Sequence, residues 1–232
     1  MMDLSVIIPA HNEADRIEWT LDKTIFHLQD LGANMQAEIL VIENGSTDET
    51  AEIVEHKQVS CPWVRLLRMA RADKGLAVRA GMLAARGDLR YMADADLATD
   101  IQHIWDFLRI ANKGHQIVIG HRDPIINQTK HRAVMSKVFH WCSSLLLPDI
   151  HDTQAGYKLF TAEAARAVFN RAQIYGWAFD VEILYIAKQL GLSIAEVKIP
   201  WINRSGSKVK PMDSVYMLRD LIRIWGCHEL AA

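Results

Sequence analysis

The sequence predicts an α/β fold in which a mostly parallel central sheet is flanked by helices. Short apolar runs alternate with longer segments whose apolar residues recur at helical spacing. The short runs are continuously apolar, which is typical of parallel strands that helices cover on both faces. With 232 residues, the chain is long enough for one domain with a sizeable core.

The expected elements follow one another in strand–helix order. Asn44 and Gly45 predict a turn after the second strand, and Ser46, Thr47 or Asp48 can cap the helix that comes next. Apolar runs predict strands at residues 4–10, from residue 38, and at 63–69, 89–93 and 115–122, and helices are expected at 13–31 and 75–86.

Polar clusters follow four of these strands, with the sequences PAHNE, ENGSTD, DAD and GHR. Because ligands of open parallel sheets bind beyond the carboxyl ends of the strands, we expect these clusters to form one crevice. Asp94 and Asp96 belong to the third cluster, where an extended chain would direct both side chains the same way. A divalent cation between two such carboxylates would relieve their repulsion. The alternative is that both carboxylates are solvated at a strand end and bind no ion.

Composition and missing motifs exclude several classes of protein. The formal net charge of −2 argues against a nucleic-acid partner. The chain has no GxGxxG after the first strand and no P-loop. Three widely spaced cysteines form neither a disulfide framework nor a zinc motif. No signal peptide or membrane span is apparent, so we expect a cytoplasmic protein, soluble or peripheral at the membrane face.

An ordered series of motifs resembles family 2 glycosyltransferases of the GT-A fold, in particular the dolichyl-phosphate glucosyl- and mannosyltransferases. The series is VIIPAHNE, VIENGSTDET, KGLAVRAGMLAARGD, DADLATD, GHR, DTQAGYKLF, WAFDVEIL and RSGSK. The resemblance implies a single GT-A domain over residues 1–232, in which 205–232 form a lid and a C-terminal helix. It also implies an inverting enzyme that depends on Mg²⁺ or Mn²⁺ and moves a hexose from a nucleotide-diphosphate sugar to a polyprenyl or dolichyl phosphate.

The resemblance also implies which residues bind the donor. Asp94 and Asp96 match the metal-diphosphate motif, with Asp96 as a catalytic residue, and the pattern DADLAT favours glucose over mannose. Asn44 stands where relatives commonly have an aspartate. The implied nucleotide-sugar contacts are Pro9, Ala10, Asn12, Glu13, Glu43, Asn44, Lys74, Asp94, Ala95, Asp96 and, in a Gly/Ser stretch that resembles a lid, Arg204, Ser207 and Lys208.

The acceptor side is expected to be basic. A lipid phosphate is already anionic and attacks without a general base, so it needs positive charge to hold it near the donor. The resemblance places Arg122, Arg132, Ser136 and Gln154 around that phosphate. Arg122 and Asp152 are also candidate catalytic residues; Asp152 would act as a general base if the acceptor were a hydroxyl.

Several alternatives stay open at this point. One has the same donor with a soluble or glycan acceptor, and another is a non-catalytic nucleotide-sugar-binding subunit that regulates a partner. Segments 134–147 and 215–225 either lie on a membrane surface or pack on the sheet. Asp180 and Glu182 are expected to be structural carboxylates, and Trp177 is either a core residue or a sugar platform. His103, His115, His131 and His140 show no metal-ligand spacing.

Overall fold

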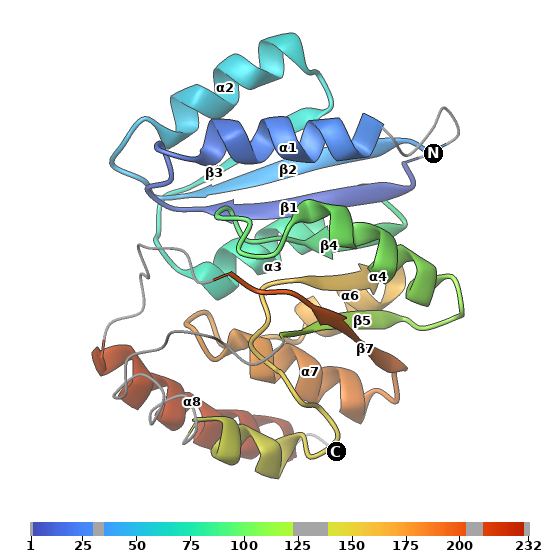
Figure 1. Cartoon of the computed structure of the whole chain (residues 1–232). Helices are drawn as coiled ribbons and strands as arrows, with labels where there is room; N and C mark the ends of the chain where they lie inside the picture. Colours follow the sequence, from blue (N-terminus) through green and yellow to red (C-terminus); the bar gives the residue numbers. More distant parts are fainter. Residues whose placement is uncertain (1, 30–34, 123–138, 203–210, 230–232) are drawn as a thin grey trace.

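The computed structural model describes residues 2–29, 35–122, 139–202 and 211–229 (Figure 1). Its centre is a seven-stranded sheet with the strand order β3-β2-β1-β4-β6-β5-β7. The strands are β1 (Leu4–Ala10), β2 (Ala37–Asn44), β3 (Val64–Met69), β4 (Leu89–Met92), β5 (Ile117–Arg122), β6 (Lys158–Thr161) and β7 (Ile194–Ile199).

Helices cover both faces of this sheet (Figure 1). Residues 139–146 are also helical. The helices are α1 (Ile17–Gln29), α2 (Thr50–Ser60), α3 (Lys74–Ala84), the short η1 (Ile101–His103), α4 (Ile104–Ala111), α6 (Ala162–Phe169), α7 (Phe179–Gln189) and α8 (Pro211–Glu229).

Side-chain alternation along β1 divides the core into two layers. Ile7 belongs to the layer formed with α3, α6 and α7, whereas Val6 and Ile8 belong to the layer formed with α1, α2 and α4. All three side chains are completely buried. The continuous apolar run of this strand is thus explained, because each face of the strand meets helices.

The pairing pattern confirms a mostly parallel sheet. β1 runs parallel to β2 and β4, β2 runs parallel to β3, and β5 runs parallel to β7. β6 lies between β4 and β5 and is antiparallel to both. The apolar runs therefore predicted the first five strands. They did not predict β6, which begins at the charged Lys158, or β7, in which Glu196 and Lys198 interrupt the apolar pattern.

Two predicted helix boundaries differ from the structure. The helix expected from residue 13 begins at Ile17, because the backbone N–H of Glu13 donates to Thr50 Oγ1 (2.8 Å) and residues 11–16 form turns. The second helix begins at Thr50, and its N-cap residue is Glu49, which is none of the three predicted residues and makes no side-chain cap bond; Asp48 Oδ1 accepts from the Thr50 N–H at 3.1 Å. Within the described ranges, no helix is both long and apolar enough to cross a bilayer.

Candidate functional site

The polar segments after β1 and β2 are joined by hydrogen bonds. Asn12 has a φ of 51°, which Asn tolerates better than most residues. Its N–H donates to Ser46 Oγ (3.0 Å), and its Oδ1 accepts from the Thr47 N–H (2.8 Å). The polar clusters PAHNE and ENGSTD are therefore joined at the carboxyl edge of the sheet, as their positions after neighbouring strands predicted.

Glu43 and Asn44 at the end of β2 are buried and hold backbone groups. Glu43 Oε1 accepts from the Ser46 N–H, and Asn44 Oδ1 accepts from the N–H of Asp73 at 3.1 Å. Asn44 thereby links β2 to the segment that leads into α3. An uncharged amide suffices for this bond, so the departure from the aspartate of relatives is compatible with the local structure.

Asp94 and Asp96 lie in a turn beyond the end of β4, so the expectation based on strand alternation was wrong. The N–H of Leu97 donates to the Asp94 carbonyl (3.2 Å), and Leu97 has a φ of 44°. The carboxylates are nevertheless coupled electrostatically. Burial and the charge of Asp94 raise the pKa of Asp96, although the Ala98 N–H donates to Asp96 Oδ1 at 3.0 Å.

Lys74 is the cation that balances Asp94 in this structure. It is the first residue of α3, and its Nζ lies 2.7 Å from Asp94 Oδ1 and 5.7 Å from the centre of the Trp177 ring. Burial alone would raise the pKa of Asp94, but the charge and hydrogen bond of Lys74 outweigh it and leave that pKa below its ordinary value. Asp94 is therefore ionised at neutral pH.

Gly156 is a site residue that the sequence analysis missed. A Cβ atom at this position would lie 1.7 Å from Asp94 Oδ2, so any larger residue would displace the carboxylate. The glycine is in the DTQAGYKLF motif, but nothing in the sequence predicted that this motif would meet Asp94. The contact packs the segment before β6 against the turn after β4.

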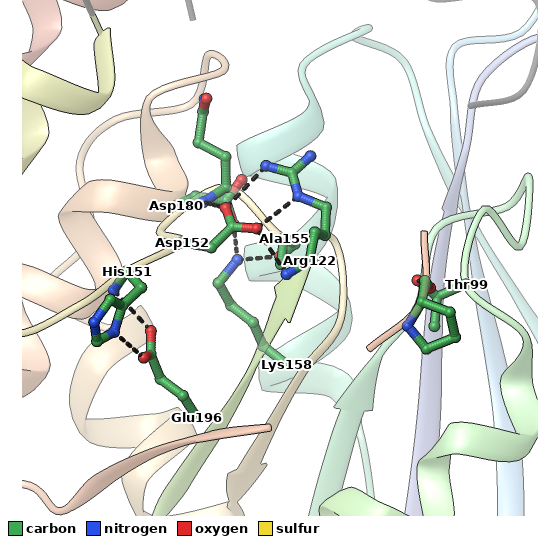
Figure 2. A network of polar contacts seen from close by, with 10 residues as sticks. Thr99, Arg122, His151, Asp152, Ala155, Lys158, Asp180 and Glu196 are labelled. Atoms are coloured by element: carbon green, nitrogen blue, oxygen red, sulfur yellow. Dashed lines mark hydrogen bonds and ion pairs between the residues drawn. The ribbon is translucent and has the colours of Figure 1, made fainter. Parts of the chain in front are cut away.

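Arg122 and Asp152 form a two-pronged ion pair (Figure 2). Arg122 Nε and Nη2 donate to the two carboxylate oxygens at 2.6 and 2.8 Å. Burial would raise the pKa of Asp152, but the Arg122 guanidinium outweighs it and lowers that pKa. Arg122 also lies 5.8 Å from the centre of the Trp201 ring. The pair fixes the guanidinium at the end of β5.

A second, fully buried ion pair lies next to the first in Figure 2. Lys158 Nζ donates to Asp180 Oδ1 (2.6 Å) and to the Ala155 carbonyl (2.5 Å). The Lys158 side chain is 0% exposed and that of Asp180 is 7% exposed. Removal of either charge would therefore leave the other buried without its partner. Glu182, also buried, accepts from the N–H of Ile174 at 2.8 Å. Asp180 and Glu182 are thus structural carboxylates, as expected.

A cleft of about 490 Å³ opens beside Lys74. It lies between the start of α3, the segment before α7, and α8. Trp177 lines the cleft and also packs, partly buried, against the core. Basic residues outnumber acidic ones among its lining residues, so it favours an anionic occupant. The lining residues that give it this character are Arg71, Lys74, Tyr175, Trp177, Arg219 and Arg223, with Asp73 and Asp220 as the acidic ones.

The remaining predicted residues divide into two groups. The first group lies within the described residues. Pro9 and Ala10 end β1, and the buried Ala95 accepts a hydrogen bond at its carbonyl from Thr20 Oγ1 (2.6 Å). The Gln154 N–H donates to Asp152 Oδ1 (3.2 Å). The other group lies outside the described residues and comprises Arg132, Ser136, Arg204, Ser207 and Lys208.

The residues at Asp94 and Asp96 fit a hard divalent cation such as Mg²⁺ or Mn²⁺. Both offer carboxylate oxygens, which these ions prefer. Burial and the charge of Asp94 keep the pKa of Asp96 raised although Lys74 is paired with Asp94, so Lys74 does not offset all the negative charge at this turn. A cation bound there would lower that pKa.

Sequence comparison identifies related proteins. The family model described as Glycosyl transferase family 2 matches residues 5–174. The dolichyl-phosphate beta-glucosyltransferase of Dictyostelium discoideum is 39% identical, over 95% of this chain and 73% of its own length. The enzyme of the same name from Homo sapiens is 32% identical, over 95% of this chain and 74% of its own length.

Structural comparison identifies the fold as GT-A. Mannosyl-3-phosphoglycerate synthase from Rubrobacter xylanophilus superposes with a TM-score of 0.72 at 18% identity, covering 97% of this chain and 73% of its own. Glucosyl-3-phosphoglycerate synthase from Mycobacterium tuberculosis, solved with Mn²⁺, UDP-glucose and phosphoglyceric acid, superposes with a TM-score of 0.70 at 21% identity, covering 97% and 78%.

Proposed function

Because the chain belongs to glycosyl transferase family 2 and is a hexosyltransferase, we propose that it transfers glucose from UDP-glucose to a dolichyl or related polyprenyl phosphate. Relatives named dolichyl-phosphate beta-glucosyltransferase match over most of both chains. Glucose agrees with the DADLAT pattern noted in the sequence. The hexosyltransferase assignment removes the support for a non-catalytic regulatory subunit.

The ion pair of Asp152 with Arg122 is the observation that favours a phosphate acceptor over a hydroxyl acceptor. Both of its carboxylate oxygens are engaged by Arg122, at 2.6 and 2.8 Å. A general base needs a free oxygen and a pKa near the working pH, whereas Arg122 lowers the pKa of Asp152. A phosphate acceptor needs no base because it is already ionised. Asp152 is thus suited to orienting Arg122 toward an acceptor phosphate.

The proposed reaction is a single displacement with inversion. A phosphate oxygen of the acceptor forms a bond to the anomeric carbon while the bond from that carbon to the UDP oxygen breaks, and UDP leaves with the electron pair. Asp94 and Asp96 would hold a divalent cation, which when bound supplies positive charge to the leaving diphosphate. Lys74 adds a fixed positive charge at the same turn, and Arg122 holds the incoming phosphate.

Membrane contact is part of the proposal because the acceptor is a lipid. Residues 139–146 and α8 bury part of their apolar surface in the same core layer, yet Trp141 and Leu145 are 64% and 68% exposed, and Ile222 and Trp225 are 71% and 54% exposed. Leu221 is buried, so the apolar residues of segment 215–225 are divided between the core and solvent and do not form one face. We propose that the exposed group rests on a bilayer surface at its cytoplasmic side.

The proposal also includes the domain organisation expected from the family resemblance. The lid and C-terminal helix predicted over residues 205–232 include α8 (Pro211–Glu229), which supports the helix, and residues 205–210, which lie outside the described residues. We retain a single GT-A domain over 1–232 with that lid as part of the proposal.

The alternative acceptor is tested by product analysis. The protein is incubated with UDP-[¹⁴C]glucose or GDP-[¹⁴C]mannose, Mn²⁺ and either polyprenyl-phosphate vesicles or a panel of soluble sugars and phosphorylated acids. We expect label from UDP-glucose in the lipid fraction, released by mild acid as glucose. Label in a soluble product with none in the lipid would refute the lipid acceptor, and label from GDP-mannose alone would refute the donor.

A further inference from the structure

A cluster of imidazole and carboxylate groups lies apart from the Asp94–Asp96 pair. His121 is on β5, His151 is in the segment before β6, and Glu196 is on β7. One ligand atom from each lies within 4.8 Å of the others. Among the residues that the structure describes, this is the one group of three or more His, Cys, Asp or Glu side chains close enough to share a metal ion.

Glu196 orients His151 within the cluster. The His151 backbone N–H and ring Nδ1 lie 2.9 and 2.6 Å from the two oxygens of the Glu196 carboxylate, and both contacts are drawn in Figure 2. A metal ion that replaced the proton shared between His151 Nδ1 and the Glu196 carboxylate would be bound by both groups, because each offers a lone pair there.

His121 is the residue that an ordinary ion pair does not explain. Its ring stacks on that of His151 with a centroid separation of 5.3 Å and an interplanar angle of 8°. One nitrogen of His121 lies within 4.8 Å of a ligand atom on His151 and on Glu196. The nearly parallel rings direct their in-plane lone pairs alongside each other, so one ring must rotate for both nitrogens to reach the same ion. A cation coordinated by these nitrogens would hold the two rings together.

The donor chemistry identifies the class of ion. Two imidazole nitrogens and one carboxylate oxygen form the ligand set of several zinc sites, whereas Mg²⁺ and Mn²⁺ prefer all-oxygen sites such as the Asp94–Asp96 pair. His151 is 71% exposed, so a further coordination position would be open to water. We propose that His121, His151 and Glu196 bind a zinc ion at a second metal site, distinct from the one that the donor diphosphate requires.

Two of the zinc ligands are adjacent in sequence to the residues of the Arg122–Asp152 ion pair. His121 directly precedes Arg122, and His151 directly precedes Asp152. An ion held by the two histidines and Glu196 would tie β5, β7 and the segment before β6 to one another. It would therefore stabilise the backbone positions from which Arg122 and Asp152 form their ion pair.

Calorimetric titration of the whole chain with ZnCl₂, in buffer that contains excess Mg²⁺, tests this site. We expect one zinc ion per chain, with affinity reduced at least about tenfold in His121→Ala and Glu196→Gln, on the scale of losing a ligand. Asp94→Asn/Asp96→Asn should keep zinc binding. His103→Ala is the matched control, because His103 also contacts a carboxylate (Asp106, 3.3 Å) and should bind zinc as the parent does.

A second measurement uses the unmodified protein, so its result does not depend on whether the variants fold. Co²⁺ replaces zinc in such sites and gives visible ligand-field absorption, so the unmodified protein should show a Co²⁺ spectrum that one equivalent of zinc removes. Zinc should also raise the melting temperature of the unmodified protein. Absence of the spectrum, or zinc binding that His121→Ala/His151→Ala leaves unchanged, would overturn the proposal.

Discussion

The two sides of the site are held together in different ways. We name them for what we propose they bind: the donor half comprises the segments after β1, β2 and β4, and the acceptor half comprises the end of β5 and the elements paired with it by charge. Beyond β1 and β2, the polar side chains mostly bond to backbone N–H groups, as in the contacts of Asn12 with Thr47 and of Asn44 with Asp73. Around the end of β5 and the starts of β6 and α7, charged side chains bond to each other, in the pairs Arg122–Asp152 and Lys158–Asp180. The donor half is therefore joined mainly by bonds from backbone N–H groups to side chains, apart from ion pairs such as Lys74–Asp94, whereas the acceptor half is a network of opposite charges.

This difference has a physical basis in what each half is proposed to hold. A nucleotide presents many hydrogen-bonding groups, and a wall of fixed backbone and amide groups suits it. An acceptor phosphate presents concentrated negative charge, so a guanidinium that is already oriented by a carboxylate requires little rearrangement on binding. The two halves should consequently respond differently to mutation.

The largest effect is expected in the acceptor half, from Lys158→Met. The substitution leaves Asp180 buried without its cation, and we expect a loss of about 3–5 kcal/mol in the free energy of unfolding. Urea denaturation at pH 7 measures it. The double variant Lys158→Met/Asp180→Leu should recover most of the loss, because it removes both charges. Equal stability of the single variant and the parent would show that the buried pair contributes nothing.

In the donor half, Asp96→Asn should spare the fold and remove activity. The amide oxygen can still accept the Ala98 N–H (3.0 Å in the parent), but the residue loses the charge proposed to bind the metal. We expect transfer to fall by about 10²–10³-fold, the scale seen when one electrostatic contact to a transition state is removed. Initial rates with UDP-[¹⁴C]glucose and Mn²⁺ measure it, and a rate within threefold of the parent would contradict the metal assignment.

Glu38 provides a pH-dependent comparison, since it is a buried carboxylate near the start of β2, at the opposite edge of the sheet from the site. It accepts from Ser5 Oγ (2.6 Å) and Arg65 Nη1 (2.6 Å). Burial opposes ionisation, but Ser5, Arg65 and the Arg86 N–H outweigh it and lower the pKa of Glu38. Because the pKa is lower in the folded state, the stabilisation is present above the unfolded pKa of about 4.3 and is lost as pH falls through the folded value.

Glu38→Gln should therefore destabilise the protein by about 1–2 kcal/mol at pH 7, where charged hydrogen bonds are lost. The difference from the parent should shrink below pH 4 as Glu38 becomes protonated. Thermal unfolding at a series of pH values measures both curves. A difference that stays constant between pH 7 and pH 3 would show that the effect is steric rather than electrostatic.

The smallest effect concerns the exposed apolar residues beside the acceptor half. Trp141→Ala and Trp225→Ala should each weaken binding to vesicles with anionic lipids by about fivefold to tenfold, as expected for an aromatic side chain partly inserted in the interface. Trp105→Ala is the matched control, because Trp105 is also exposed (41%) but lies on α4. Co-sedimentation with vesicles measures binding, and equal losses in all three variants would contradict a specific membrane face.

The sequence predicted the donor half better than the acceptor half. β1, β2 and β4 are apolar runs, and each is followed directly by its polar cluster, so the strand-end rule placed Asn12, Glu43 and Asp94 at one edge. The geometry of the Asp94–Asp96 turn was not predictable, because the strand ends at Met92 and a positive φ at Leu97 has no sequence signal.

The acceptor half depends on contacts between residues that are far apart in the sequence. Lys158 and Asp180 are 22 residues apart, and a buried lysine is rare enough that its charge argued against a strand. Arg122 and Asp152 were each identified as candidates through the family resemblance, but their pairing across 30 residues was not predicted. The same distance in sequence separates His121 from His151, which hid that cluster as well.

The most direct test of the account separates the two halves in one variant, Arg122→Ala/Asp152→Asn, which removes the guanidinium without leaving a buried charge. Calorimetry with UDP-glucose and Mn²⁺ gives its donor affinity, and initial rates with polyprenyl phosphate give its transfer activity. We expect a donor Kd within about twofold of the parent and transfer lower by about 100-fold or more. A donor Kd that weakens as much as transfer would contradict the division into a donor half and an acceptor half.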